Sequence, residues 1–489
     1  MTSEGAILGA IAVPLAGAAL IGAAHRMPNL RETVTLVTAT ALFLLVAALA
    51  PEVLAGGRPG VHVAEVMPGI ALAFRVEPLG MLFALVASGL WIVNSLYSIG
   101  YMRGNREAHQ TRYYVCFAAA LASTMGIAFA GNLFTLFLFY EALTLVTYPL
   151  VTHHGTEEAM RAGRLYLALL IGTSIALLLV AIVWTWSIAG TIEFARGGIL
   201  GGHASNATVG LLLALYVFGI GKAAVMPVHR WLPAAMVAPT PVSALLHAVA
   251  VVKAGVFAVL KIVVYVFGVD AIAGLKSVDW LPFISGFTII AASIVALRSD
   301  NLKRRLAYST VSQLSYVVLA AALLTPLSVI GAALHIATHA LGKITLFFCA
   351  GAIYTAAHKT EVSQLDGIGR RMPWTMAAFT VGALSLIGVP PAAGFVSKWF
   401  IISGALQAGH HLAVAVFVAS TLLNAAYFLP IVHAAFFRRG AVDAHAAHGE
   451  APWPMVVALT LTAGATLALF FVADLPLALA RQLVSGPAG

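Results

Sequence analysis

The chain has 489 residues, of which 61% are hydrophobic and 9% are charged, and its mean hydropathy is +0.97. A soluble domain carries about 25% charged residues, so the composition excludes that class and indicates a polytopic membrane protein. The net charge of +9 does not indicate nucleic-acid binding, because the basic residues are scattered singly between apolar runs. Cys116 and Cys349 lie in apolar runs without metal-ligand or disulfide spacing, which is typical of packing residues.

Apolar runs long enough to cross a bilayer predict an all-α protein with about fourteen transmembrane helices. The first run lacks a basic leader and a cleavage site, so residues 1–24 are expected to remain as a helix. The segment Gly56–Arg75 contains glycines and alternating valines, which predict a short extracytoplasmic hairpin. The expected spans are 5–24, 33–50, 78–101, 112–130, 132–152, 163–189, 207–228, 241–267, 280–297, 307–324, 327–356, 374–407, 411–436 and 453–475.

The loops between these spans differ strongly in basic residues. Seventeen lysines and arginines fall in the loops on one side, five fall on the other side, and five lie within spans, which accounts for all 27. Because basic loops stay in the cytoplasm, both termini are predicted to lie outside a bacterial or archaeal cell membrane. An even number of spans is consistent with this arrangement.

Five ionisable groups lie inside the apolar runs: Glu141, Lys222, Lys253, Lys343 and Lys398. A charge at the centre of a membrane helix costs roughly 3 kcal/mol on insertion scales. Such residues therefore indicate an ion pathway rather than a passive scaffold. A solute transporter is also disfavoured, because we would expect it to have more polar residues at mid-depth.

Two of the lysines lie where the helix is expected to break. Lys222 follows two glycines and precedes Pro227, and Lys398 follows Pro390 and Pro391. Broken helices free carbonyls that hold cations or water, and they occur in inverted repeats. We therefore predict breaks in spans 7 and 12 and two inverted five-helix repeats, near 112–267 and 280–436.

His335, His339 and Lys343 are spaced four residues apart, so on a helix they share one face over about 12 Å. Imidazole both accepts and donates a proton, and a desolvated lysine binds its proton less tightly than one in water. This spacing predicts a proton relay to which His247 and Lys253 also belong, with Lys343 as the principal carrier. Lys261 lies near a span end, which predicts that it snorkels to the interface.

Four stretches resemble signatures of the antiporter-like proton-pumping subunits of respiratory complex I, of membrane-bound hydrogenases and of Mrp-type cation/proton antiporters. They are 226–233 (MPVHRWLP), 238–247 (APTPVSALLH), 301–313 (NLKRRLAYSTVSQ) and 388–398 (GVPPAAGFVSK). The likeness extends from about Leu79 to Phe437. In length the chain is closest to the D-type subunit of the Mrp complexes.

The resemblance implies a fourteen-helix fold with two inverted repeats, no cofactor in this subunit, and other membrane subunits as partners. By matching position, Glu141 is the glutamate that pairs with Lys222. The next element of the pathway consists of Lys253 and His247. A central axis follows, formed by His335, His339 and Lys343, and Lys398 is the terminal lysine. Lysine at 398 argues against the middle pump of complex I. Whether the chain serves an enzyme, such as an NADH:quinone oxidoreductase or hydrogenase complex, stays open, as do Na⁺/H⁺ exchange and a proton-driven inorganic-carbon uptake system.

The sequence shows no Rossmann glycine pattern, no cysteine cluster and no metal site. The pairs His153–His154 and His410–His411 lie near span ends, which is typical of solvated interface residues. His445 and His448 are expected in a surface loop. The chemistry predicted for this chain is therefore proton transfer alone.

Overall fold

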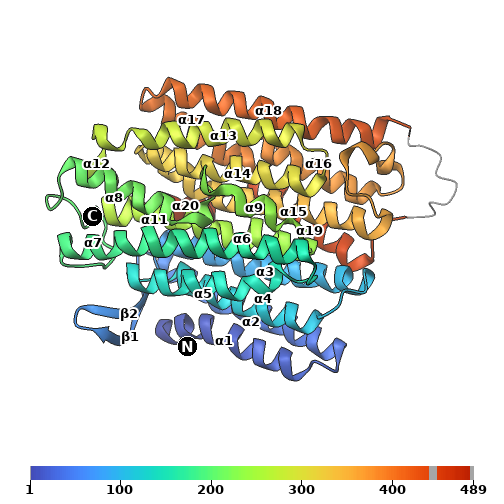
Figure 1. Cartoon of the computed structure of the whole chain (residues 1–489), viewed down its shortest axis with the longest axis horizontal. Coiled ribbons are helices and arrows are strands. Elements are labelled where there is room, and N and C mark those ends of the chain that lie inside the picture. The colour runs from blue at the N-terminus through green and yellow to red at the C-terminus, as the bar shows by residue number, and fades with distance from the viewer. Residues whose placement is uncertain (1, 440–448, 485–489) are drawn as a thin grey trace.

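The computed structural model describes residues 2–439 and 449–484. Its long helices run side by side along one direction (Figure 1). In chain order the helices and strands are α1 (Ser3–Ala23), α2 (Pro28–Leu54), β1 (Gly60–Met67), β2 (Ile70–Arg75), α3 (Pro78–Gly104), α4 (Gln110–Ala128), α5 (Leu133–Val151), α6 (Glu157–Thr173), α7 (Val180–Ala189), α8 (Asn206–Gly219), α9 (Trp231–Ala234), α10 (Thr240–Ala244), α11 (Val251–Ile262), α12 (Val269–Ile272), α13 (Trp280–Arg298), α14 (Leu302–Ala322), α15 (Pro326–Ala357), α16 (Pro373–Ile387), α17 (Gly394–Gln407), α18 (His411–Phe437), α19 (Trp453–Phe471) and α20 (Asp474–Arg481).

The predicted class of all-α polytopic membrane protein is confirmed. Within the described residues, ten helical stretches are long and apolar enough to cross a membrane. The remaining predicted spans correspond to α4, α14, α8 and the pair α16–α17, which are shorter or more polar. The count of fourteen therefore stays a prediction.

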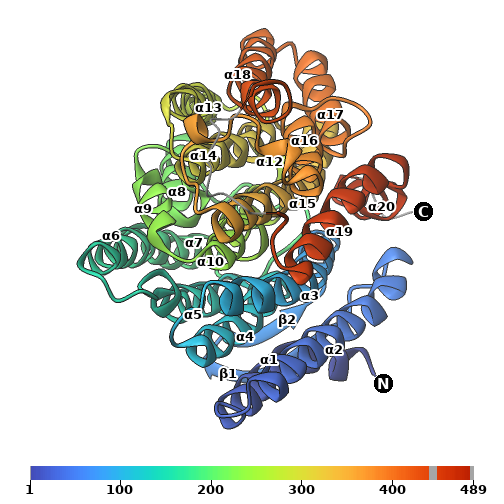
Figure 2. The same cartoon turned by 90° about the vertical axis from the view of Figure 1, so that its right-hand side faces the viewer.

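Two spans form the centre of the bundle. In the end-on view, α15 lies among the other helices, with α1–α2 on one flank and α18 on the opposite flank (Figure 2). In the most apolar 18-residue stretch of 240–267, 100% of the residues are buried, and in that of α15 the share is 94%. In the corresponding stretch of α18 only 33% of the residues are buried. The two central spans carry five of the predicted relay residues, which are His247, Lys253, His335, His339 and Lys343.

Both predicted helix breaks are present. The seventh span stops at Gly219, and Lys222 follows in a single 3₁₀ turn, 221–223, before the chain passes Pro227. The twelfth span is divided into α16 and α17, which end and begin on either side of Gly388, Pro390 and Pro391. Gly388 has φ +90°, a left-handed conformation that glycine adopts without a steric penalty. The span with His247 is also irregular, because 245–249 is a π-helical turn, a distortion frequent at functional sites.

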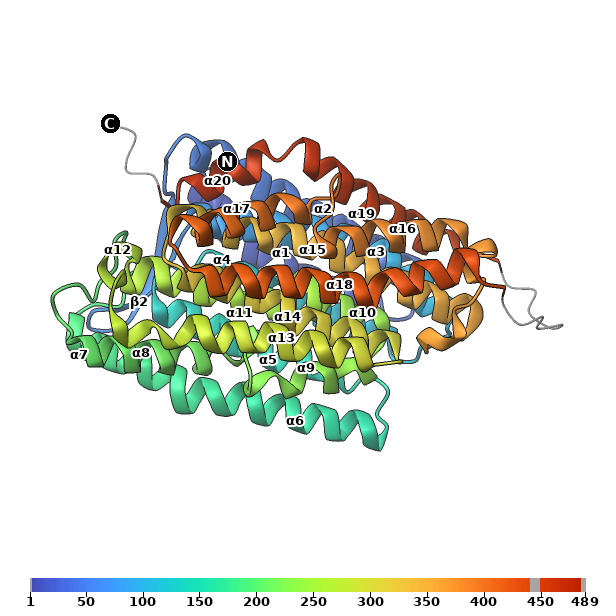
Figure 3. The same ribbon diagram turned by 90° about the horizontal axis from the view of Figure 1, so that it is seen from above.

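The predicted hairpin is confirmed, since β1 and β2 pair antiparallel from Gly60 opposite Arg75 to Met67 opposite Ile70. The two described ends of the chain lie close to its base. Ser3 donates to Glu52, and the Gln482 side chain bonds to both Arg58 and the Leu54 carbonyl. The described part of the chain thus begins and ends at one end of the bundle. Figure 3 shows this hairpin end and the opposite end from above.

Gly255 allows α11 to contact the broken segment around Lys222. A Cβ atom at Gly255 would lie 2.3 Å from the Lys222 carbonyl carbon and from the Ala223 nitrogen. Gly255→Ala should therefore lower the stability of the fold by about 1–3 kcal/mol, the usual cost of overpacking. Thermal unfolding in mild detergent measures this effect. Gly464→Ala on α19, where nothing lies within 4 Å of the added carbon, is the matched control, and equal melting of the two variants would contradict the packing argument.

Candidate functional site

Lys222 is fully buried and is held by neutral groups of α5. Its Nζ donates to the Tyr140 carbonyl oxygen at 2.7 Å and to the Thr144 Oγ1 at 2.6 Å. The nitrogen also lies 3.2 Å from the centre of the Tyr140 ring, where the ring quadrupole attracts a cation. The Tyr140 hydroxyl accepts from the Lys222 backbone N–H. Tyr140 therefore contacts both the charge and the broken backbone of this segment.

Glu141 is the residue that follows Tyr140 on α5, but it makes no direct ion pair with Lys222. The ion pairs found among the described residues, at nitrogen–oxygen distances up to 4.0 Å, do not include these two side chains. The Oε1 atom of Glu141 is buried and has no hydrogen-bond partner in the described part of the chain. Glu141 therefore lacks the direct contact with Lys222 that the matching position implied.

Lys253 connects the two central spans. Its Nζ lies 2.5 Å from Nδ1 of His339, joining α11 to α15. The rings of His339 and His335 are 5.7 Å apart, and Nδ1 of His335 lies 2.9 Å from the Ser397 hydroxyl on α17. All three titratable side chains are buried. The groups therefore lie in a row from Lys253 to Ser397, although Nε2 of each histidine has no hydrogen-bond partner among the described residues.

Lys398 is held by the second helix break. Its Nζ donates to the carbonyl oxygens of Leu386 and Ile387, at 2.8 and 2.9 Å. These residues end α16, where carbonyls lack the N–H partners that a continuing helix would supply. The nitrogen also lies 4.9 Å from the Tyr316 ring centre. The break thus creates the acceptor site for this lysine.

Lys343 and His247 lie to one side of that line. Lys343 Nζ donates to the Leu306 carbonyl at 2.9 Å, so it contacts α14 rather than Lys253 or Lys398. Both ring nitrogens of His247 are buried without a hydrogen-bond partner among the described residues, and its ring packs on Phe347 at 4.6 Å. The contacts therefore place the two histidines, rather than Lys343, between Lys253 and Ser397.

The prediction that Lys261 snorkels to the interface is wrong. Its side chain is fully buried, donates to the Ala130 carbonyl at 2.7 Å and pairs with Glu77 Oε2 at 3.1 Å. The Lys261 ammonium does not have to reach water, because the Glu77 carboxylate, just before α3, supplies a buried counter-charge. Sequence reasoning missed this pair because its members are 184 positions apart and only the fold brings them together.

The histidine pairs near span ends differ in their environments. His410 and His411 are exposed, as predicted, but His153 is 3% exposed, and burial lowers its pKa to about 4. The expectation of solvation is therefore wrong for His153, because Tyr113 packs against its ring. His445 and His448 lie outside the described residues. No group of three or more His, Cys, Asp or Glu suited to a metal occurs within the described ranges.

Sequence reasoning also missed the neutral partners of the buried charges. Tyr140 and Thr144 hold Lys222, Ser397 links His335 to α17, and Tyr316 stacks on His335 at 5.4 Å. Each is an uncharged residue in an apolar run, where hydroxyl groups and rings are common. The position of Ser397 directly before Lys398 was the one feature of the sequence that could have indicated a role for one of these neutral residues.

Comparisons with known proteins agree with this architecture. Residues 130–424 match the family model described as NADH:quinone oxidoreductase/Mrp antiporter, TM. The chain is 35% identical over 413 residues to NADH-quinone oxidoreductase subunit N of Desulforudis audaxviator, covering 81% of each protein. It is 28% identical to the D subunit of an Na(+)/H(+) antiporter from Alkalihalophilus pseudofirmus, covering 73% of this chain and 71% of the relative. A chain of the Mrp complex from Dietzia has the same fold, with a TM-score of 0.88, 24% identity and coverage of 99% and 97%.

The fold and the match define a polytopic antiporter-like membrane subunit. The chain belongs to the NADH:quinone oxidoreductase/Mrp antiporter transmembrane family. The resemblance inferred from the four sequence stretches is thereby confirmed.

The contribution of the Glu77–Lys261 ion pair to the stability of the fold can be tested by mutation. Removing one member of a buried pair leaves an uncompensated charge, which costs about 3–5 kcal/mol, whereas removing both costs much less. Glu77→Gln and Lys261→Met should each lower the melting temperature of the purified protein, and the double variant should recover most of the loss. Additive losses in the double variant would show that the two side chains do not stabilise each other.

Proposed function

We propose that this chain is a proton-translocating subunit of a multisubunit membrane complex. The observation that carries the proposal is the row of buried groups from Lys253 through His339 and His335 to Ser397, which precedes Lys398 in the chain. Neutral imidazole can take a proton on one nitrogen and release one from the other. Placing ionisable groups in an apolar interior costs free energy, and a helix bundle with a purely structural role would not require them.

Lys222 and Glu141 are the controlling pair in this mechanism. The field of the Glu141 carboxylate stabilises the Lys222 ammonium, which otherwise has only neutral partners. When a neighbouring charge or a conformational change weakens that field, desolvation drives the proton off Lys222. The proton then passes to Lys253 by way of bridging water. The two inverted repeats near 112–267 and 280–436 place one broken helix on each side of this path.

The remaining elements of the proposal are its partners and orientation. The chain carries no nucleotide or redox motif, so the energy for transport comes from other subunits. The loops rich in lysine and arginine face the cytoplasm, and both termini lie outside. A relative named as an Na(+)/H(+) antiporter subunit makes Na⁺/H⁺ exchange the alternative, and inorganic-carbon uptake is a further use of the same relay.

Removal of either controlling group should stop transport. Glu141→Gln and Lys222→Ala in the assembled complex should each lower proton translocation at least about tenfold, since each leaves its partner's charge uncompensated. A pH-sensitive dye in sealed vesicles measures the rate, and the amount of assembled complex in the membrane is the control. Translocation at the wild-type rate by both variants would contradict the proposal.

The contacts also rank the carriers. His339→Ala breaks the direct link to Lys253, whereas Lys343→Ala removes a group whose hydrogen bond is to the Leu306 carbonyl of α14. His339→Ala should therefore slow translocation more than Lys343→Ala does. Both variants are compared in the same vesicles, at equal complex content. The opposite ranking would make Lys343 the obligate carrier, as the sequence alone suggested.

A further inference from the structure

A cavity of about 210 Å³ opens at the end of the bundle opposite the hairpin. Its wall includes Glu107 from the α3–α4 loop, His154 from the turn after α5, and Lys303 near the start of α14. None of these three groups belongs to the relay described above. They are contributed by separate parts of the chain and meet around one space.

The side chains of Glu107 and His154 are in contact at this cavity. The Oε2 of Glu107 lies 3.3 Å from Nε2 of His154, and their side chains are 13% and 37% exposed. The pair is therefore reached by water while most of the carboxylate is enclosed. A carboxylate and an imidazole at this distance can share a proton taken from the aqueous phase.

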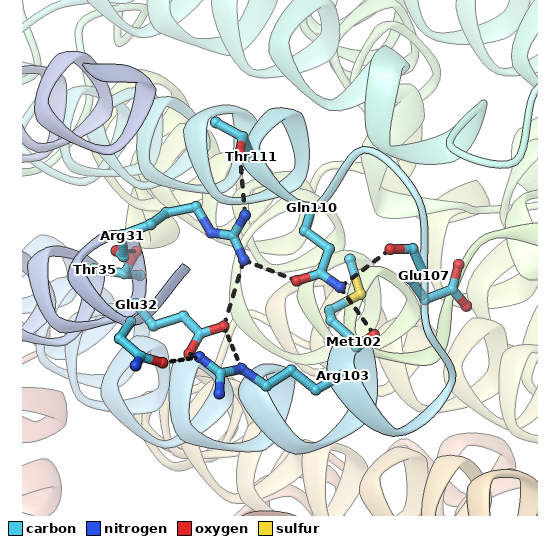
Figure 4. Close-up of polar contacts among 9 residues, drawn as sticks. Arg31, Glu32, Thr35, Met102, Arg103, Glu107, Gln110 and Thr111 are labelled. Carbon is cyan, nitrogen blue, oxygen red and sulfur yellow. Dashed lines mark hydrogen bonds and ion pairs between the residues drawn. The ribbon is translucent and has the colours of Figure 1, made fainter. Parts of the chain in front are cut away.

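A buried polar network fixes the loop that presents Glu107 (Figure 4). The Gln110 amide donates to the backbone carbonyls of Glu107 and Met102, both at 3.1 Å. The guanidinium of Arg31 donates to the Gln110 side-chain oxygen at 2.8 Å. Because Arg31 lies on α2, three helices determine where the loop places the carboxylate.

Glu32 completes this network. Its carboxylate accepts from Arg103 Nε at 2.9 Å and pairs with Arg31 at 3.4 Å. Arg31 and Glu32 are 4% exposed, and desolvating such charges is worthwhile only when they are well paired. The cost of this arrangement indicates that the position of the loop matters.

The inner wall of the cavity adjoins the central span. Lys303 donates to the Ala238 carbonyl at 2.5 Å, and Ala238 and Thr240 both line the cavity. Thr240 begins the buried span that contains His247 about 10 Å further along the helix. The buried ring nitrogens of His247 have no hydrogen-bond partner among the described residues. The cavity thus ends at the start of the span that carries His247 and Lys253.

We propose that this cavity is the site of proton uptake, with Glu107 and His154 collecting protons from the basic side of the protein and delivering them toward His247. This inference rests on the proposed proton translocation. The proton moves from water to the Glu107–His154 pair, and then past Lys303 to the start of the central span.

Rescue by a mobile buffer distinguishes uptake from a merely structural ion pair. Glu107→Gln and His154→Gln should each slow translocation by the assembled complex about tenfold in weakly buffered medium. Imidazole added on the side of the cavity should restore the rate, because it carries protons into the open space. Glu157→Gln is the matched control, since that carboxylate is 77% exposed and pairs with Arg161 on the same helix, and it should translocate as the wild type does.

The outcomes separate the two proposals. A deficit in Glu107→Gln that imidazole does not repair, or no deficit at all, would overturn the uptake site. Lys222→Ala should not respond to imidazole, because its defect lies beyond the cavity. If Lys222→Ala translocates normally while Glu107→Gln is slow and is rescued by buffer, the uptake site stands and the relay through Lys222 is wrong.

Discussion

The free-energy cost of holding an ammonium group away from water determines most of this structure. Lys222, Lys253, Lys343 and Lys398 are all at most 5% exposed, and a buried charge is tolerated only when other groups replace its hydration. A continuous helix offers few free acceptors, because its carbonyls are already bonded. The break after Ile387 supplies two such carbonyls to Lys398, and the break after Gly219 lets Lys222 reach α5.

The choice of partner separates two kinds of buried lysine. Lys261 is paired with the Glu77 carboxylate, so loss of its proton would leave a buried anion. The relay lysines contact carbonyls, hydroxyls, rings or an imidazole instead. Such partners hold an ammonium by hydrogen bonds and also tolerate a neutral amine. Neutral partners therefore suit groups that must gain and lose protons, and a carboxylate partner suits a group that stays charged.

Sequence patterns predicted the parts of this site that depend on local order. Glycines and prolines placed the breaks near Pro227 and Pro390, and the four-residue spacing placed His335, His339 and Lys343 on α15. The hairpin at Gly60–Arg75 followed from its glycines and alternating valines. These features rest on helix periodicity and backbone restriction, which neighbouring residues determine.

The contacts between distant segments were not predictable in the same way. Lys253 meets His339 across 86 positions, and Glu77 lies beside Lys261, so both contacts require knowledge of how the spans pack. The ranking of the carriers depended on the same information, because the sequence alone had made Lys343 the principal carrier. Snorkelling was a reasonable inference for a lysine near a span end, but it ignored the counter-charge that α3 provides.

The central claim is that the relay lysines change charge during transport while Lys261 does not. Nitrogen NMR of the assembled complex, with ¹⁵N in the lysine side chains, distinguishes an ammonium from a neutral amine, and single lysine variants assign the signals. During turnover, signals that disappear in Lys222→Ala and Lys253→Ala should show neutral amine, and the signal that disappears in Lys261→Met should stay ammonium. If every buried lysine remained an ammonium in both the resting and the working complex, the account would be contradicted.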